Sequence, residues 1–293
     1  MKNAARHPAK SRREKRRATR KPEHSLLALA ERGDLSALNT LSQQAGNPDF
    51  PVKNDGTTLL HLAARHGHAT IARILLDERQ ANAGIVRDDG VSALYLAAQN
   101  GHEAVARVLL SSPGMDPNQA TGDGANPLYV AVQFGHAKLV RILLANTDVD
   151  VNHARKDGVT ALLMACAKGY LGIARALLET DAIDTNQSNA DGVSPLYLAA
   201  QDNHPRIVRA LLARPETNPN IQRLNGDTPL HAAARFGWRE IVRILLADPR
   251  TNSRIRRSDG SDPLQIAFDE EHLDVIDAFI ERGIVRESHE SVH

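Results

Sequence analysis

Apolar residues recur along the chain with a period of 34 residues. Leucine recurs at Leu60, Leu94, Leu128, Leu162, Leu196, Leu230 and Leu264, and alanine recurs at Ala63, Ala97, Ala131, Ala165, Ala199, Ala233 and Ala267. Within each period, the apolar spacing predicts a first helix of about two turns, a second helix of about three turns and roughly fifteen residues of loop. The second helix has its apolar stripe at Ile71, Leu75 and Leu76 and at equivalent positions. Such self-similarity is typical of stacked units that cover one another's apolar surface.

Polar residues mark where these helices begin and end. Each period opens with an Asp-Gly or Asn-Gly turn dipeptide, at positions 55–56, 89–90, 123–124, 157–158, 191–192, 225–226 and 259–260. Two residues later stands a side-chain oxygen that can cap a helix: Thr58, Ser92, Asn126, Thr160, Ser194, Thr228 or Asp262. Proline follows this cap at Pro127, Pro195, Pro229 and Pro263, where its missing N–H costs nothing. The first helix runs up to a glycine at Gly33, Gly67, Gly101, Gly135, Gly169 and Gly237, with Asn203 filling the gap in the series.

These residues carry a family resemblance. A tetratricopeptide repeat has a similar period, but it has two longer helices and a short connection. The segments "DGTTLLHLAARHGHATIARILL" and "NGDTPLHAAARFGWREIVRILL" resemble ankyrin repeats, whose signature is T-P-L-H-x-A-A followed by G-H and a paired leucine. Seven copies match, and residues 24–42 resemble a degenerate first cap. The resemblance implies an all-α ankyrin-repeat solenoid of stacked helix-turn-helix units with β-turn or hairpin loops.

The expected solenoid spans residues 23–282, between a basic arm at 1–22 and a tail at 283–293. Its units lie near 23–53, 54–87, 88–121, 122–155, 156–189, 190–223, 224–257 and 258–282. The segments that follow the second helices, such as "ANTDVDVN", are one residue longer than the G-A-D-V-N pattern usual in the family. We expect Pro113, Pro215 and Pro249 to stop these helices. Asp274, Asp277 and Glu281 make the last second helix polar, as an end cap requires.

The net charge of +1 conceals two regions of opposite sign. Residues 1–22 carry ten Lys or Arg and one acidic residue, whereas the remainder has a net charge of −8. The arm has no hydrophobic period, and we expect it to be disordered. It resembles a nuclear-import signal centred on Arg12, Arg13, Lys15, Arg16 and Arg17. Three other interpretations remain: nonspecific binding of nucleic acid, for which stacking aromatics are lacking, docking on the acidic body, or a solubilising tail.

The chain shows no pattern of catalytic or metal-binding residues. His68, His102, His136, His204 and His272 occupy one repeat position, which the family uses for loop-bracing hydrogen bonds. The segment "DVDVN" imitates the start of a calcium loop, but His153 and Val159 stand where glycine and glutamate are needed. Cys166 replaces an apolar helix residue and is expected to be a buried structural thiol. We therefore expect no enzymatic activity, no cofactor and no metal.

An arginine recurs once per unit, at Arg73, Arg107, Arg141, Arg175, Arg209 and Arg243. The column could be an anion-binding ladder. However, packed helices lie about 8–10 Å apart, close to the ~8 Å Debye length, so solvent can screen the repulsion. The sequence favours a solvated ridge on the polar side of the second helices.

The remaining variation lies at the two positions before each glycine, which we call the groove-face residues. The resemblance implies that such positions line a concave groove and contact a protein partner. They are Arg65, His66, Gln99, Asn100, Gln133, Phe134, Lys168, Gln201, Asp202, Arg235 and Phe236, with Ala167, Asp269 and Glu270 at the other copies. Phe134 and Phe236 are candidate anchors because aromatics total only ten in the chain. The alternative is that both rings pack against a neighbouring turn.

The predicted function is a non-enzymatic protein-interaction module, and we expect a monomer. An arm-driven binder of nucleic acid or anionic membrane, with the repeats as a spacer, is the alternative, although we expect no nucleic-acid partner. The sequence has no apolar run of membrane-spanning length and no signal peptide. A single cysteine fits a reducing compartment, so we expect a cytoplasmic or nuclear location.

Overall fold

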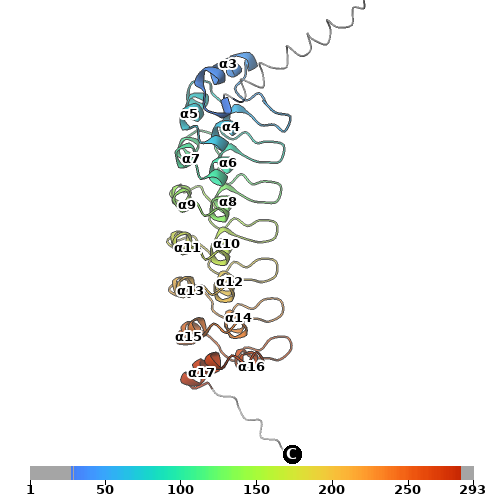
Figure 1. The fold of residues 1–293 in the computed structure, drawn as a ribbon, viewed down its shortest axis with the longest axis vertical. Helices are drawn as coiled ribbons and strands as arrows, with labels where there is room; N and C mark the ends of the chain where they lie inside the picture. Colours follow the sequence, from blue (N-terminus) through green and yellow to red (C-terminus); the bar gives the residue numbers. More distant parts are fainter. Residues whose placement is uncertain (1–27, 29, 285–293) are drawn as a thin grey trace, which may run out of the picture. The chain divides into compact units, whose positions relative to one another are not determined.

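The computed structural model describes residue 28 and residues 30–284, and this part of the chain is helical with connecting turns (Figure 1). No β-strand occurs in it, although the isolated antiparallel bridges Val86–Ser92 and Ala154–Thr160 give two connecting loops a hairpin form. The chain divides into two compact units between Gln119 and Ala120. The predicted arm and its import-signal residues lie outside the described residues.

The first unit contains α3 (Leu35–Ala45), α4 (Leu59–His66), α5 (Ala69–Asp77), α6 (Ala93–Asn100) and α7 (Glu103–Leu110). The second unit contains α8 (Pro127–Gln133), α9 (Ala137–Leu144), α10 (Ala161–Ala167), α11 (Leu171–Leu178), α12 (Pro195–Gln201), α13 (Pro205–Leu212), α14 (Pro229–Arg235), α15 (Arg239–Ala247), α16 (Pro263–Asp269) and α17 (Leu273–Glu281). Figure 1 shows the second unit in three layers. The second helices form one row, the first helices form another, and the turn loops lie beyond the first-helix row.

All seven predicted N-caps are confirmed. In each case the cap has an extended backbone, and its side-chain oxygen accepts a hydrogen bond from the N–H three residues on. Asn126 Oδ1, for example, accepts from the Tyr129 N–H at 2.8 Å. The four predicted prolines occupy the first helical position. The starts of the first helices are therefore determined by residues next to them in sequence.

The glycine series ends the first helices in the left-handed conformation. Gly169 has φ +68°, and a Cβ built there would lie 2.5 Å from Cε1 of His204. Asn203, which fills the gap in the series, has φ 58°. Glu271 occupies the next position of the same series with φ 58°, although glutamate rarely adopts this conformation.

The repeated leucines and alanines form the core. Every member of both columns is buried, and the alanines are at most 2% exposed. Small side chains at these positions allow helices of successive repeats to pack closely, whereas the leucines supply the apolar area. The predicted stripe of Ile71, Leu75 and Leu76 is also buried. These core predictions are confirmed.

Backbone hydrogen bonds join successive turns of the second unit. The Lys156 N–H donates to the Asp123 carbonyl at 3.1 Å, and the Ala190 N–H donates to the Asp157 carbonyl at 3.2 Å. Leu224 and Ser258 continue the pattern by donating to Asp191 and Asn225. The turn tips are therefore linked to one another as well as to their own helices.

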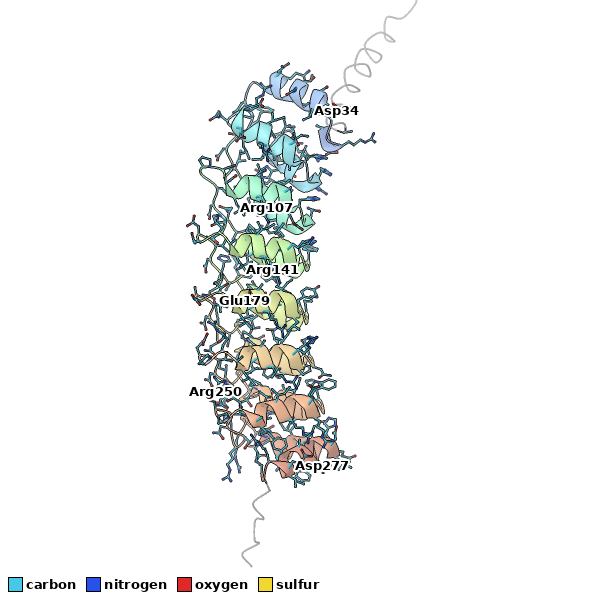
Figure 2. All side chains as sticks on the ribbon, turned by 90° about the vertical axis from the view of Figure 1, so that its left-hand side faces the viewer. Asp34, Arg107, Arg141, Glu179, Arg250 and Asp277 are labelled. Atoms are coloured by element: carbon cyan, nitrogen blue, oxygen red, sulfur yellow. The ribbon has the colours of Figure 1, made fainter. Side chains whose placement is uncertain are left out.

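Arginines bind the carboxyl ends of the second helices. Arg214 donates to the Leu178 carbonyl, Arg282 to the Leu246 carbonyl, and Arg250 to the Leu212 carbonyl at 2.7 Å. Arg250 also reaches the carbonyls of Arg214, Pro215 and Thr217, and Figure 2 shows it at the edge where these helices end. The helices α7, α13 and α15 end before Pro113, Pro215 and Pro249, but α9 and α11 end at the equivalent residues Leu144 and Leu178 without a following proline, so the prolines are not required to stop the second helices.

The last helix, α17, has a mixed outer face. Asp274, Asp277 and Glu281 are exposed, as predicted for an end cap. Leu273 and Ile280 are exposed as well, so the face is less polar than the acidic residues alone indicated.

Candidate protein-binding surface

The groove-face residues lie at the carboxyl ends of the first helices. In the first unit, Arg65, His66 and Asn100 are exposed, and Gln99 is half-buried. Partial burial lowers the pKa of His66, which favours its neutral form near pH 7. The Asn100 side-chain amide donates to the Leu96 carbonyl at 2.8 Å, so it also stabilises the last turn of α6.

In the second unit, Gln133, Phe134, Lys168, Asp202 and Phe236 are exposed. Gln201 is half-buried, and its side-chain amide donates to Asp202 Oδ1 at 3.2 Å. The residues are thus accessible from one end of each first helix.

Phe134 and Phe236 keep almost half of their surface in solvent, at 49% and 46% exposed. The Phe134 ring stacks on His136, with ring centroids 6.3 Å apart and an interplanar angle of 16°. The two phenylalanines are therefore neither fully packed nor free of contacts. A partly supported ring loses little conformational entropy when a partner covers it.

Arg235 is engaged within its own repeat. Its guanidinium contacts both oxygens of Asp227, at 3.0 and 3.3 Å, and Asp227 is completely buried. Arg257 Nε also lies 3.1 Å from Asp227 Oδ1. The equivalent positions hold Thr57, Val91, Ala125, Val159 and Val193, so this buried carboxylate belongs to one repeat. Because the charge of Arg235 is matched internally, much of it is unavailable to a partner.

Side chains of the following repeat brace the backbone below the groove face. His68 Nε2 pairs with the Glu31 carbonyl at 2.8 Å, His102 Nε2 with that of Arg65 at 3.0 Å, and His272 Nε2 with that of Arg235 at 2.9 Å. Trp238 Nε1 donates to the Gln201 carbonyl in the same way. The bracing role expected for the histidine column is confirmed at these three histidines, and it makes the groove face rigid.

The residues considered for chemistry have structural contacts. Cys166 is buried, and burial raises the pKa of its thiol, which disfavours the nucleophilic thiolate. Asp150 accepts the Asn152 N–H, and His153 pairs with the Gly124 carbonyl, so the "DVDVN" segment forms a local turn. Across the described ranges there is no group of three or more metal-ligating side chains. Within the same ranges, no helix has the length and apolarity needed to cross a membrane.

The arginine column lies on the second helices and is exposed at all six positions. Figure 2 shows Arg141 on this face of the second unit. Arg209 pairs with Glu240 at 2.9 Å, and Arg243 pairs with Glu281. The predicted solvent-exposed ridge is confirmed.

The turn layer also contains an exposed apolar residue that the repeat pattern did not predict. Leu224 lies in a turn and is 79% exposed, the highest value for a large apolar side chain in the described part of the chain. The equivalent turn positions hold Asp88, Gly122, Lys156, Ala190 and Ser258. A large apolar residue among small and polar turn residues was the available signal, and it adds apolar surface to the turn layer.

Comparisons with known proteins agree with this architecture. A family model described as ankyrin repeats (3 copies) matches residues 26–121, 113–189 and 196–287, which is more than half of the chain. Among solved structures, the chain is similar to the ankyrin repeat domain of Bcl-3, which is described as a unique member of the IkappaB protein family. That match has 25% sequence identity and a TM-score of 0.68, and it covers 76% of this chain and 100% of the other. A comparison with curated protein sequences gives no match.

Proposed function

The chain belongs to the ankyrin repeat family, and we propose that it binds a partner protein through its groove face, with no catalytic activity of its own. Ankyrin repeats are protein-interaction modules, and this supports the general class of function. The contact surface would comprise the groove-face residues together with the turn tips. No residue of this surface needs a cofactor to act.

The exposure of Phe134 and Phe236 is the observation that carries this proposal. Both lie at the same repeat position, immediately before Gly135 and Gly237, on helices that start at the caps Asn126 and Thr228. An exposed aromatic on a rigid support is typical of residues that dominate binding energy. Leu224 would add apolar area in the turn layer.

A capture experiment followed by affinity measurement tests the proposal. The full chain carrying a photo-crosslinker beside Phe236 identifies the partner. Binding of the purified partner is then measured for the Phe134→Ala/Phe236→Ala variant. We expect affinity to fall by about 2 kcal/mol, or roughly 30-fold, because two anchors are truncated. Helical content should change little, since both rings lie at the exposed ends of helices.

The matched control is Lys138→Gln/Arg141→Gln on α9, which removes two exposed charges from the ridge. This variant should bind the partner as the parent chain does. Loss of binding in the control, with binding retained in the phenylalanine variant, would show that the groove face is the wrong surface.

The charge of residues 1–22 supports an alternative, in which the arm binds nucleic acid or an anionic membrane and the repeats act as a spacer. Salt discriminates between the two functions. Binding by the arm should collapse between low and moderate salt, whereas binding by apolar anchors should persist.

A further inference from the structure

An open cavity lies between the second helices α11 and α13, on the ridge rather than on the groove face. Its volume is about 500 Å³, and Arg175, Arg206, Arg209 and Glu179 line it together with Leu178 and Ala210. Leu178, Ala210 and Ala213 supply the apolar part of its lining. Figure 2 shows Glu179 at the edge where α11 ends.

The positive charge of this cavity is incompletely matched. Three guanidinium groups and one carboxylate line it. The side chains of Arg175 and Arg206 form no hydrogen bond or ion pair with any described residue, whereas Arg209 pairs with Glu240 on α15. Both unpaired arginines are exposed and can therefore reorient towards a ligand.

The neighbouring second helices of the same unit show how such a gap is otherwise closed. Arg209 and Glu240 bridge α13 and α15 with a 2.9 Å contact. Glu281 on α17 forms ion pairs with both Arg239 and Arg243 of α15. Between α11 and α13, the residue equivalent to Glu240 is Arg206, which reverses the sign of the charge. The gap between α11 and α13 therefore has a basic residue where the gap between α13 and α15 has an acidic one.

We propose that this cavity is a docking site for an acidic segment of a partner protein, which places an apolar side chain against Ala210 and Ala213 and carboxylates against Arg175 and Arg206. Arginine can pair with a carboxylate through two parallel hydrogen bonds, which favours a carboxylate-bearing ligand at this site. The site is separate from the groove face, so it would contact a second segment of the same partner or a different one.

The lining favours a peptide over the other anionic macromolecules. The cavity has no aromatic side chain on which a nucleic-acid base could stack. Its lining combines arginines with Leu178, Ala210 and Ala213, which suits an apolar side chain flanked by carboxylates, and a layer of lipid headgroups offers no such side chain. A similar cavity of about 530 Å³ between α5 and α7 has Arg73, Arg107 and Asp77, and its charges are closer to balance.

The test uses the full chain with Arg12, Arg13, Lys15, Arg16 and Arg17 replaced by alanine as the parent, so that binding of the probe by the arm is weakened equally in every variant. The probe is a fluorescein-labelled peptide of sequence EELEELEEL, and binding is followed by fluorescence anisotropy at about 0.15 M salt. We expect saturable binding that weakens at least about tenfold in Arg175→Glu/Arg206→Glu, because two attractive charges become repulsive. The charge-reversed peptide KKLKKLKKL should bind the Arg175→Glu/Arg206→Glu variant more tightly than it binds the parent.

Four controls make the outcome specific. Arg243→Gln changes the equivalent of Arg175 in a gap already bridged by Glu281, and it should retain binding. Circular dichroism should show the same helical content in all variants. The proposal is overturned if Arg175→Glu/Arg206→Glu binds the acidic peptide as the parent does, or if Arg73→Glu/Arg107→Glu loses binding instead. It is also overturned if the parent binds phosphatidylserine vesicles but not the peptide.

Discussion

Two glycines three residues apart show how differently one residue type acts within a single repeat. Gly169 has φ +68°, and its position leaves no room for a Cβ beside the His204 ring. Gly172 lies inside α11, has ordinary helical geometry, and has no atom within 4 Å of a Cβ built on it. The first glycine is required by the fold, whereas the second only adds conformational freedom to the unfolded chain.

Substitution of these glycines by alanine should therefore change stability in opposite directions. Gly169→Ala should lower the free energy of unfolding by more than about 1 kcal/mol, because it combines backbone strain with a clash. Gly172→Ala should raise it by about 0.5–1 kcal/mol through better helix propensity. Urea unfolding followed by circular dichroism measures both. A shift of the same sign in the two variants would contradict this account.

At the scale of the helix, the start of α4 depends on the protonation of His61. The Thr58 N–H donates to His61 Nδ1 at 3.2 Å, so the ring proton is on Nε2, which donates to the Val91 carbonyl at 3.1 Å. This capping box joins one repeat to the next. Burial lowers the pKa of His61 to about 4, from an ordinary value near 6.5.

The shift predicts that stability falls in acid. Above about pH 6.5 the ring is neutral in both the folded and the unfolded state, so His61 adds no pH dependence. As the pH falls from 6.5 towards 4, the unfolded chain binds a proton at His61 that the folded chain does not bind. The free energy of unfolding therefore falls by up to about 3 kcal/mol. Below pH 4 both states are protonated, and the loss levels off.

Thermal unfolding of the parent chain and of His61→Gln between pH 7 and pH 4.5 measures this contribution. The variant should be less stable at pH 7, because the cap is weakened, but its stability should fall less steeply with acid. Carboxylates titrate in both proteins, so the difference between the two curves isolates His61. Parallel curves would show that the histidine does not titrate on unfolding in this range.

At the scale of the whole chain, the basic arm and the acidic remainder carry opposite charge. We propose that the arm acts as a nuclear-import signal and that the protein resides in the nucleus or cytoplasm. Residues 1–22 fused to an inert reporter should then move it into a eukaryotic nucleus, as fluorescence microscopy would show. Replacement of Arg12, Arg13, Lys15, Arg16 and Arg17 by alanine should abolish the movement, because the positive charge is what an import receptor reads. A reporter that stays evenly spread in both forms would remove the proposal.

The repeat architecture could be predicted from the residues because its determinants are local. A cap such as Ser92 bonds to a backbone N–H three residues on, and a left-handed glycine such as Gly67 follows from the end of its own helix. The leucine and alanine columns repeat the same requirement in each unit, so one pattern predicts the whole core. The left-handed backbone of Glu271 could not be predicted from its residue type, because glutamate rarely adopts this conformation. Its place in the glycine series was the only indication.

The arrangement of charges depended on tertiary contacts. Arg235 was predicted to face a partner, yet it pairs with Asp227, which burial leaves in need of a counter-charge. The arginine column is uniform in sequence, but Arg209 and Arg243 form ion pairs whereas the side chain of Arg175 pairs with no described residue. The differences within the arginine column arise because these side chains meet residues from the adjacent repeat, roughly one period away in sequence. A pattern of residue types specifies which helices stack, whereas the pairing of the long side chains between them follows from the geometry of the stack.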